Sequence, residues 1–407
     1  MEEHITYKLE ELSIGKGSYG IAAPAVPFVS SLHTYLRITD INDDGSLNKS
    51  SLMSVDEVDA ERYLLKPNDI VFARTGNSTG RSYFYDGSDG ELVYAGFLIK
   101  FSLDSTKVNP RIVKYYTHSK PYFDWVQSFG TGSTRGNINA KTYSNMPITL
   151  PPRNIQDKIV DILKSLDDKI EVNKRINDNL EQQAQALFKS WFVDNPDSNW
   201  KKISLSEVAS FVGGYSYTGK ELTDFSNVAM ATIKNFMRNG GFKAEGFKGI
   251  NPSAKLKECH YANLFDILVA HTDLTQNADV IGNAELLLTC GKYNSIIFSM
   301  DLVKVLPKEI FPYSFLLAAM LKNKMFKAHC LGYINGTTVL HLNKKALPEF
   351  EIRKPSDSEA KIMNEILAPY YKRMAKLLQE TDKLISLRDT LLPKLMSGEV
   401  KINETNN

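Results

Sequence analysis

The sequence has few cysteines and no long apolar run, and each absence removes a class of protein. Its 407 residues include only Cys259, Cys290 and Cys330, which lie far apart and form no CxxC pair. We therefore expect neither a disulfide framework nor a zinc site. The longest apolar run, Phe315 to Met320, is far shorter than the roughly 20 residues that span a bilayer. The first residues, MEEHITY, are unlike a secretory signal, so we expect a cytoplasmic protein without a membrane partner.

A strong charge of one sign is also missing. The formal net charge is +2, with 43% hydrophobic and 24% charged residues. Dedicated DNA-binding domains usually carry a larger excess of lysine and arginine, so composition alone leaves nucleic-acid binding open. A chain of this length is long enough for two domains, each with its own core.

Catalytic and cofactor motifs are weak or incomplete. Ile14 to Gly20 fits GxGxxG, and Asp40 follows at a suitable distance for a ribose contact, but Pro24 and Pro27 forbid the helix that a dinucleotide site needs. The partner motifs of a protein kinase are missing. Asp194 to Asp197 lacks the second proline and the aromatic residue of an amino-methyltransferase motif. We expect no catalytic residue, no metal and no cofactor in this chain.

A long amphipathic segment from Leu150 to Asp194 is the strongest positive feature. Its apolar residues follow the a and d positions of a helix that needs a partner, at Ile159, Leu166, Leu180 and Leu187, with a second row at Ile162, Ile170, Ala184 and Trp191. One helix of this kind cannot bury its apolar face alone.

The expected partner is the C-terminal segment. There, apolar residues recur every seven positions at Met363, Tyr370, Leu377, Leu384 and Leu391. Met363 lies 204 residues after Ile159, and the same offset relates Leu187 to Leu391, Pro151 to Pro355, Gly132 to Gly336 and Asn139 to Asn343. A constant offset indicates an internal repeat, and we predict that the two helices pack antiparallel. Two unrelated amphipathic helices are the alternative.

Three residues conflict with uninterrupted apolar helices. Pro369 predicts a kink or short break, and Pro393 predicts the end of the second helix, with Gly398 just beyond. Asn173 occupies an a position, where it is either partly solvated or sets the register between the helices.

A module of mixed helices and strands is predicted before each of the two long helices. Residues 1–150 and 196–354 both contain short β-branched and aromatic runs bounded by turn residues, and each contains one expected helix, over 110–126 and 312–330. The helical regions are 151–195 and 355–407. We predict an α+β fold in which two α/β modules are separated by two long antiparallel helices that form a coiled coil with pseudo-two-fold repetition.

Two polar loops in the first module carry residues that bind nucleic acid elsewhere. The segments 73–82 and 130–137 combine arginine, asparagine, serine and threonine with glycine, and 271–277 with 335–338 are their counterparts in the second module. Arginine pairs with guanine, asparagine or glutamine with adenine, and hydroxyl groups with phosphates. Solvated turns are the alternative interpretation.

The chain resembles the specificity subunits of type I restriction-modification systems. The resemblance covers nearly the whole length. It rests on two strings: the central-helix string that begins with LPP at residues 150–152 and ends with AQALFKSWFVD at 184–194, and RDTLLPKLMSGEV in the distal helix. Departures are Asn195 in place of an aromatic residue, Ala360 at the position of Gln156, and Pro369.

The resemblance implies a non-catalytic subunit with two target-recognition domains, each reading one half of a bipartite double-stranded DNA site. The paired helices would set the spacer and dock two modification (methyltransferase) subunits, which would supply S-adenosylmethionine, and restriction/motor subunits would join the full complex. Candidate DNA-binding residues are Arg74, Thr75, Asn77, Ser78, Thr79, Arg81, Ser133, Thr134, Arg135 and Asn137 for one half-site, and His271, Thr272, Asp273, Thr275, Gln276, Asn277, Thr337 and Thr338 for the other.

Two other functions fit the same sequence less well. A coiled-coil adaptor without a DNA role would show no sequence preference in competition binding. A stand-alone DNA methylase or nuclease would need a cofactor motif that the sequence does not show.

Overall fold

The computed structural model describes residues 4–130, 136–238 and 240–400, and divides into two compact units. One comprises Met1–Asp168 with Ser386–Asn407, and the other comprises Lys169–Ile385. Each unit contains one α/β module together with a part of each long helix.

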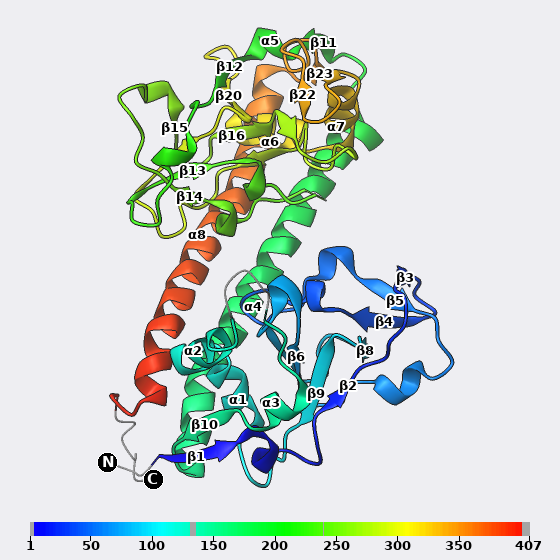
Figure 1. Cartoon of the computed structure of the whole chain (residues 1–407). Coiled ribbons are helices and arrows are strands. Elements are labelled where there is room, and N and C mark those ends of the chain that lie inside the picture. The colour runs from blue at the N-terminus through cyan, green and yellow to red at the C-terminus, as the bar shows by residue number, and fades with distance from the viewer. Residues whose placement is uncertain (1–3, 131–135, 239, 401–407) are drawn as a thin grey trace. The chain divides into compact units, whose positions relative to one another are not determined.

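The first unit contains two four-stranded sheets and a terminal strand pair (Figure 1). The antiparallel sheet has the order β2 (Ser18–Tyr19), β9 (Leu98–Ser102), β6 (Asp69–Ala73) and β7 (Ser82–Tyr85). The second sheet has the order β3 (Val26–Pro27), β5 (Met53–Val55), β4 (His33–Leu36) and β8 (Leu92–Tyr94), with β4 and β8 parallel. Strand β1 (Ile5–Lys8) pairs with β10 (Pro147–Leu150).

Helices α1 (Pro110–Tyr116), α2 (Lys120–Gln127) and α3 (Ala140–Ser144) complete this module. The single helix expected over 110–126 is therefore two helices. Pro121 has no amide hydrogen and its ring clashes with a preceding carbonyl, so it is tolerated only in the first turn of a new helix. The core packs Ile112 of α1 and Phe72 of β6 with Ile159 and Leu163 of the long helix.

The second unit repeats this plan. Its antiparallel sheet has the order β12 (Ala209–Gly213), β20 (Leu302–Pro307), β16 (Ile267–Ala270) and β18 (Ala284–Leu286), and its mixed sheet the order β14 (Lys248–Gly249), β13 (Val228–Ala231), β19 (Ser295–Phe298) and β15 (Tyr261–Ala262). Strand β11 (Lys201–Ser204) pairs with β23 (Glu351–Lys354), and a small sheet joins β17 (Thr272–Asp273), β22 (Leu340–Leu342) and β21 (Ile334–Asn335). The helices are α5 (Leu205–Val208), α6 (Ser314–Leu321) and α7 (Lys324–Leu331).

The long helices are α4 (Arg153–Lys189), which continues into a π-helical turn over Ser190–Asp194, and α8 (Asp357–Met396). In the first unit, Asp167 of α4 bonds to Arg388 of α8. In the second unit, Asn173 of α4 bonds to Thr381 of α8. Residue numbers rise along one helix as they fall along the other, which confirms the predicted antiparallel pair.

The buried faces of the two helices are broader than the predicted heptad rows. Of the predicted residues, Ile159 and Leu377 are fully buried, whereas Leu166, Leu180, Leu187, Met363, Tyr370, Leu384 and Leu391 are half-buried. On α8 the most deeply buried row includes Leu367, Tyr371, Leu392 and Leu395. Each helix packs against an α/β module as well as its partner, so the buried arc is wider than a coiled-coil seam. Ile162, expected in the second row, is 36% exposed instead.

The two prolines do not interrupt α8. Pro369 is exposed, so water can bond to the carbonyl that lacks an amide partner, and the expected break is absent. Pro393 lies within the last turns and does not end the helix, which continues to Met396. Gly398 follows with φ of 74°, a left-handed conformation typical of the residue after a helix C-cap.

A polar layer interrupts the apolar contact between the helices in the second unit. Asn173 is fully buried, so the partly solvated alternative is wrong. Its Nδ2 donates to Glu380 at 3.3 Å and to Thr381 at 3.4 Å. Among the described residues, the Oδ1 atoms of Asn173 and Asn177 accept no hydrogen bond. A polar residue at an a position specifies register at a cost in stability.

We expect the double variant Asn173→Leu/Thr381→Val to raise the free energy of unfolding by about 1 kcal/mol, because it removes a poorly satisfied polar layer from a buried contact. Urea denaturation measures the change. Val172→Leu, at an exposed position on the same helix, is the control and should alter stability little. A loss of stability in the double variant would contradict the polar-layer assignment.

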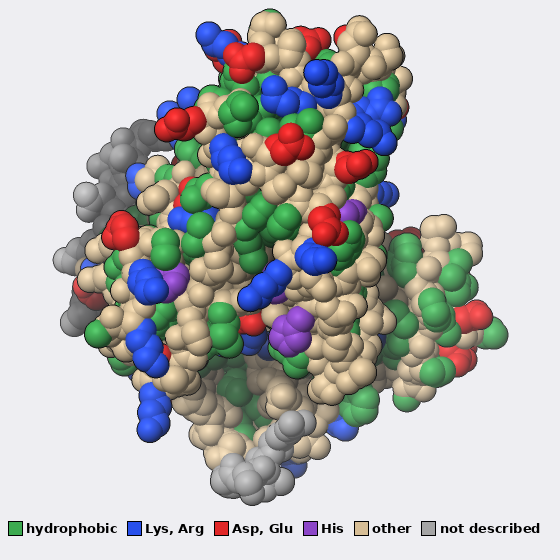
Figure 2. Space-filling model, turned by 90° about the horizontal axis from the view of Figure 1, so that it is seen from above, with side chains coloured by type: hydrophobic (Ala, Val, Ile, Leu, Met, Phe, Trp, Pro, Cys, Tyr) green, Lys and Arg blue, Asp and Glu red, His purple; other side chains and the backbone are tan. Residues whose placement is uncertain are grey.

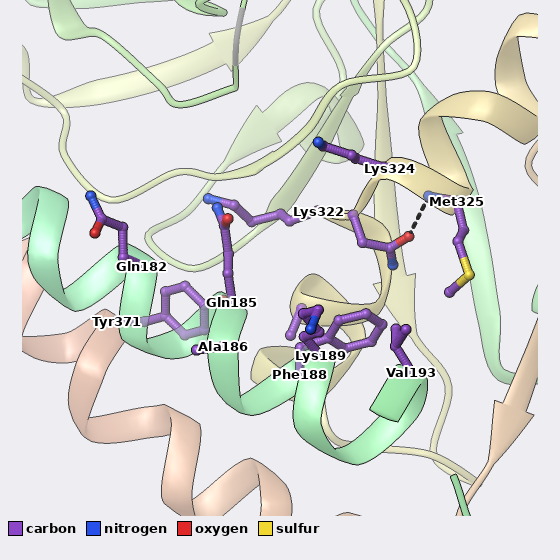
Figure 3. Close-up of a pocket in the computed structure, with 12 residues that line it drawn as sticks. Gln182, Gln185, Ala186, Phe188, Lys189, Val193, Lys322, Lys324, Met325 and Tyr371 are labelled. Carbon is purple, nitrogen blue, oxygen red and sulfur yellow. Dashed lines mark hydrogen bonds between the residues drawn. The ribbon is translucent and has the colours of Figure 1, made fainter. Parts of the chain in front are cut away.

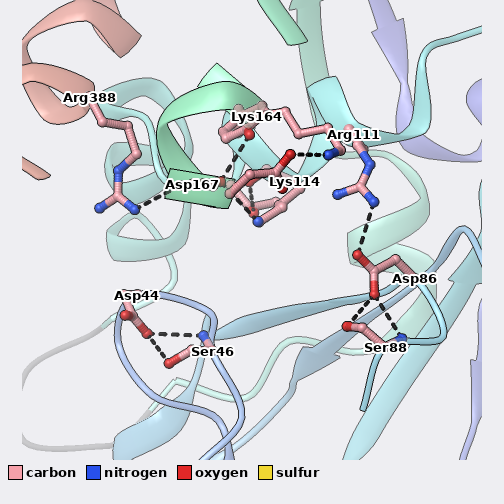
Figure 4. Close-up of polar contacts among 12 residues, drawn as sticks. Asp44, Ser46, Asp86, Ser88, Arg111, Lys114, Lys164, Asp167 and Arg388 are labelled. Carbon is pink, nitrogen blue, oxygen red and sulfur yellow. Dashed lines mark hydrogen bonds and ion pairs between the residues drawn. The ribbon is translucent and has the colours of Figure 1, made fainter. Parts of the chain in front are cut away.

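An ion cluster joins α1 to both long helices in the first unit (Figure 4). Asp167 accepts from Tyr115 Oη at 2.9 Å, from Arg388 Nη1 at 3.1 Å and from Lys114 Nζ at 3.2 Å. Burial opposes ionisation of Asp167, but Lys114 and Arg388 outweigh it and lower the pKa of its carboxyl. On the same module, burial and the charge of Lys114 lower the pKa of His118 to about 4.

His118 should make stability depend on pH. Unfolding restores its ordinary pKa of about 6.5, so the unfolded chain gains a proton first and stability falls as pH drops from about 6.5 to 4. We expect His118→Gln to reduce, by on the order of 1–2 kcal/mol, the loss of unfolding free energy between pH 7 and pH 5. Urea titrations at both pH values measure it. An unchanged pH dependence would contradict the neutral, enclosed imidazole.

Candidate nucleic-acid interface

The polar loop after β6 is held in a compact conformation by its own backbone. Arg74 N donates to the carbonyl of Phe97 at 3.1 Å, and Gly80 N donates to that of Ala73 at 2.9 Å. Gly76 and Gly80 have φ values of 74° and 89°, and a Cβ on Gly80 would lie 2.5 Å from the Val126 side chain. Glycine is therefore required there for both backbone conformation and space.

The two arginines of this loop differ in their freedom to bind a ligand. Arg81 donates to the carbonyl of Ile41 at 3.0 Å and pairs with Asp43 at 2.7 Å, so its guanidinium is already used. The guanidinium of Arg74 lies 5.2 Å from the centre of the Tyr19 ring. Its Nε is buried and has no hydrogen-bond partner among the described residues. Arg74 is half-buried, and its guanidinium forms no ion pair with a described residue, so it is the better placed of the two arginines to bind a ligand.

The structure brings the second predicted segment against this loop. Thr79 Oγ1 donates to the carbonyl of Gly136 at 3.0 Å, and Ile138 N donates to that of Arg74 at 2.9 Å. Asn77 and Asn137 are exposed, and Thr75 and Thr79 are half-buried. Ser133, Thr134 and Arg135 lie outside the described residues.

The counterpart segments of the second unit also meet. Gln276 Nε2 donates to the carbonyl of Thr337 at 2.6 Å, so this amide is partly used within the protein. Asn277, Thr337 and Thr338 are exposed, while His271 and Thr275 are half-buried. Burial, with the positive charge of neighbouring groups, lowers the pKa of His271.

Three of the predicted DNA-binding residues are buried and do not present their side chains on the surface. They are Ser78, Thr272 and Asp273, at 6%, 4% and 2% exposure. Asp273 accepts from the amides of Thr275 and Val280 at 2.8 and 2.6 Å, and these bonds lower the pKa of its carboxyl against the opposing effect of burial. Aspartate commonly closes turns in this way, a role that residue type alone does not distinguish from DNA binding.

Sequence reasoning missed two aromatic residues beside Arg74. Tyr19 and Phe97 are 42% and 55% exposed. The Tyr19 ring lies beside the Arg74 guanidinium, and the main-chain carbonyl of Phe97 accepts from Arg74 N. Tyr19 lies in the glycine-rich segment that resembled a cofactor motif. Gly20 is needed there because a Cβ would lie 2.2 Å from the Tyr94 carbonyl oxygen. Two exposed aromatic residues next to turn glycines were the available signal.

A cavity of about 510 Å³ adjoins the C-terminal part of α4 in the second unit (Figure 3). Phe188 of α4, Val193 of the π-helical turn, Tyr371 of α8 and Met325 of α7 contribute apolar surface, and lysines contribute to its lining. Lys322 there is buried and pairs with Glu285 at 2.6 Å. Its ammonium group thus holds α6 to β18, and the cavity is a surface for apolar contact.

The described part of the chain shows neither a metal-binding cluster nor a membrane-spanning helix. No set of three or more His, Cys, Asp or Glu residues there is arranged to hold a metal ion. No described helix is both long and apolar enough to cross a membrane. On the face drawn in Figure 2, lysine and arginine side chains are interspersed with acidic ones.

Comparison with known proteins decides the family. The model of the type I restriction modification DNA specificity domain matches the chain twice, over residues 28–182 and 197–386. The chain belongs to this family. Its two matches make it a protein with two DNA specificity domains, in agreement with the internal repeat.

Specificity subunits are among the relatives of the chain. It is 25% identical to the type I restriction enzyme HindI specificity subunit of Haemophilus influenzae, over 83% of this chain and 87% of that protein. It is 22% identical to the MjaIX specificity subunit of Methanocaldococcus jannaschii, over 71% and 69%. The S subunit from M. genitalium shares the fold, with a TM-score of 0.57 at 14% identity over 97% and 96% of the two chains.

Replacing Asp273 by Ala should lower the free energy of unfolding by about 2–3 kcal/mol, because buried amide donors would lose their acceptor. Chemical denaturation measures the loss. Asn277→Ala, at an exposed position in the same loop, is the matched control and should change stability little. Equal effects of the two variants would contradict the structural role of Asp273.

Proposed function

We propose that this specificity subunit reads a bipartite DNA site, with one half recognised by each specificity domain. The observation that carries the proposal is a backbone arrangement that recurs in both domains, which we call the frame. In both domains a polar loop after the central strand of the antiparallel sheet meets a second polar segment, while the side chains differ. The same backbone arrangement with different side chains suits two half-sites of different base sequence.

Exposed side chains on each frame suit contacts to base edges and phosphates. In the first domain the exposed Asn77 and Asn137 supply amide donors, and the half-buried Arg74 supplies a guanidinium. Asn277, Thr337 and Thr338 supply amide and hydroxyl groups in the second. Arginine and asparagine read purines in the major groove, and hydroxyls bind phosphates. Ser78, Thr272 and Asp273 would act by shaping these loops.

The chain would act without catalysis of its own, within a cytoplasmic complex. Two modification subunits would dock on the helical regions and supply S-adenosylmethionine for methylation of a flipped base. Restriction/motor subunits would join the full complex. The apolar cavity beside α4 supports such docking, since Val193 and Met325 at its edge are 48% and 52% exposed.

The helix pair would set the length of the unread spacer. Seven residues inserted after Asp168 and seven after Ile385 preserve the heptad pattern and lengthen each helix by about 10 Å. Because one base pair occupies about 3.4 Å, we expect the tolerated spacer to grow by about three base pairs. Sequencing methylated DNA after reaction with the assembled complex measures the spacer.

Seven residues inserted into the exposed turn at Gly87 are the control and should leave the spacer unchanged. An unchanged spacer after the paired helix insertions, in a complex that still methylates DNA, would contradict the role of the helices as a ruler. If the chain without insertions showed no sequence preference in either half of the DNA site, the proposed function itself would be contradicted.

A further inference from the structure

The two specificity domains share one backbone frame at the end of the central strand. In the first domain Ala73 is paired with Leu98, and in the second Ala270 is paired with Leu302. One residue beyond each pair, Arg74 N donates to the carbonyl of Phe97 at 3.1 Å, and His271 N donates to that of Asp301 at 2.8 Å. Arg74 and His271 therefore occupy equivalent positions, as do Phe97 and Asp301.

Two further pairs of positions follow from the same frame. Ile138 N donates to the carbonyl of Arg74, and Leu342 N donates to that of His271, both at 2.9 Å. Asn137 and His341, which precede these donors, are equivalent and exposed.

The last pair lies on the neighbouring edge strand. Tyr19 is paired with Ile99, and Gly213 is paired with Val303, 204 residues further along the chain than Ile99. The four positions carry Tyr, Arg, Phe and Asn in the first domain and Gly, His, Asp and His in the second. Identical backbone contacts with four different side chains identify positions at which the domains differ in chemistry rather than in architecture.

We propose that these four equivalent positions form a specificity subsite in each domain, and that in the first domain Tyr19 and Arg74 read a guanine. This inference rests on the proposed DNA-reading function and names the residues that give each half-site its identity. The Arg74 guanidinium lies against the Tyr19 ring, which restricts its motion before binding. No described residue accepts a hydrogen bond from its buried Nε.

A guanidinium held in this way is suited to the paired acceptors O6 and N7 of guanine, which it can bond side by side. Phe97, whose carbonyl accepts from Arg74 N, is 55% exposed and adds an apolar side chain at the third of the four positions. Arg81, already bonded to Ile41 and Asp43, is not available for this role. In the second domain Gly213 offers no ring and His271 no guanidinium, so a different base is read.

The test uses the complete chain assembled with modification subunits, and DNA in which each guanine of the first half-site is replaced in turn by 7-deazaguanine, which lacks the N7 acceptor. We expect one replacement to weaken binding about tenfold for the unaltered chain, and to have no further effect on Arg74→Ala. Arg62→Ala, at an exposed arginine of the same domain, should keep the full sensitivity.

The outcomes separate the subsite from the general function. If scrambling the first half-site does not weaken binding, the proposed DNA-reading function fails. If scrambling weakens binding but no 7-deazaguanine does, or if Arg74→Ala stays as sensitive as the unaltered chain, the guanine assignment is overturned. Even if Arg74→Ala does not fold, a scan of the unaltered chain in which no replacement weakens binding overturns the guanine assignment.

A transplant tests the equivalence of the frames independently. A Cβ on Gly213 meets no atom within 4 Å, so Gly213→Tyr with His271→Arg can be built into the second domain without a clash at that atom. We expect this variant to change the preferred base at one position of the second half-site and to leave the first half-site unchanged, as measured by sequencing methylated DNA. An unchanged second half-site would overturn the equivalence.

Discussion

The burial of the apolar faces of α4 and α8 is the constraint on which the rest of the structure depends. Neither helix can cover these faces by itself, because an apolar stripe on a helix surface is removed from water only when another element packs against it. In each unit the faces are covered partly by the other helix and partly by the α/β module. Folding of a module and pairing of the helices are therefore coupled through a common core.

Polar contacts between the helices specify the alignment of the helices more than they stabilise the pair. In the first unit Arg388 and Lys114 converge on Asp167, and in the second Asn173 meets Thr381. Partly buried ion pairs and amide contacts contribute little net free energy, since their groups must leave water. They do penalise a shifted alignment, in which these groups would remain buried without partners. This favours a single register in a helix pair that apolar contacts alone would leave less defined.

Duplication explains how one architecture can serve two different half-sites. The strand pairings and backbone hydrogen bonds that position Arg74 recur around His271, because they depend on main-chain atoms and not on side-chain identity. Side chains at the ends of these strands can therefore change while the core remains intact. Buried residues such as Asp273 have no such freedom, since their polar groups already bind the loop that they support.

The sequence by itself determined the repeat and the two long amphipathic helices, because heptad spacing and a constant offset are properties of the chain alone. Their antiparallel direction was a prediction that contacts in the structure confirmed. It also indicated which loops carry polar residues, although the DNA-binding role of each residue remains a prediction. Only the tertiary structure decided that Arg81 and Asp273 bind their own protein, that Arg74 remains available beside Tyr19, and that Pro369 leaves α8 unbroken. The reason is physical: the availability of a side chain depends on neighbours distant in sequence, whose positions periodicity and residue type do not encode.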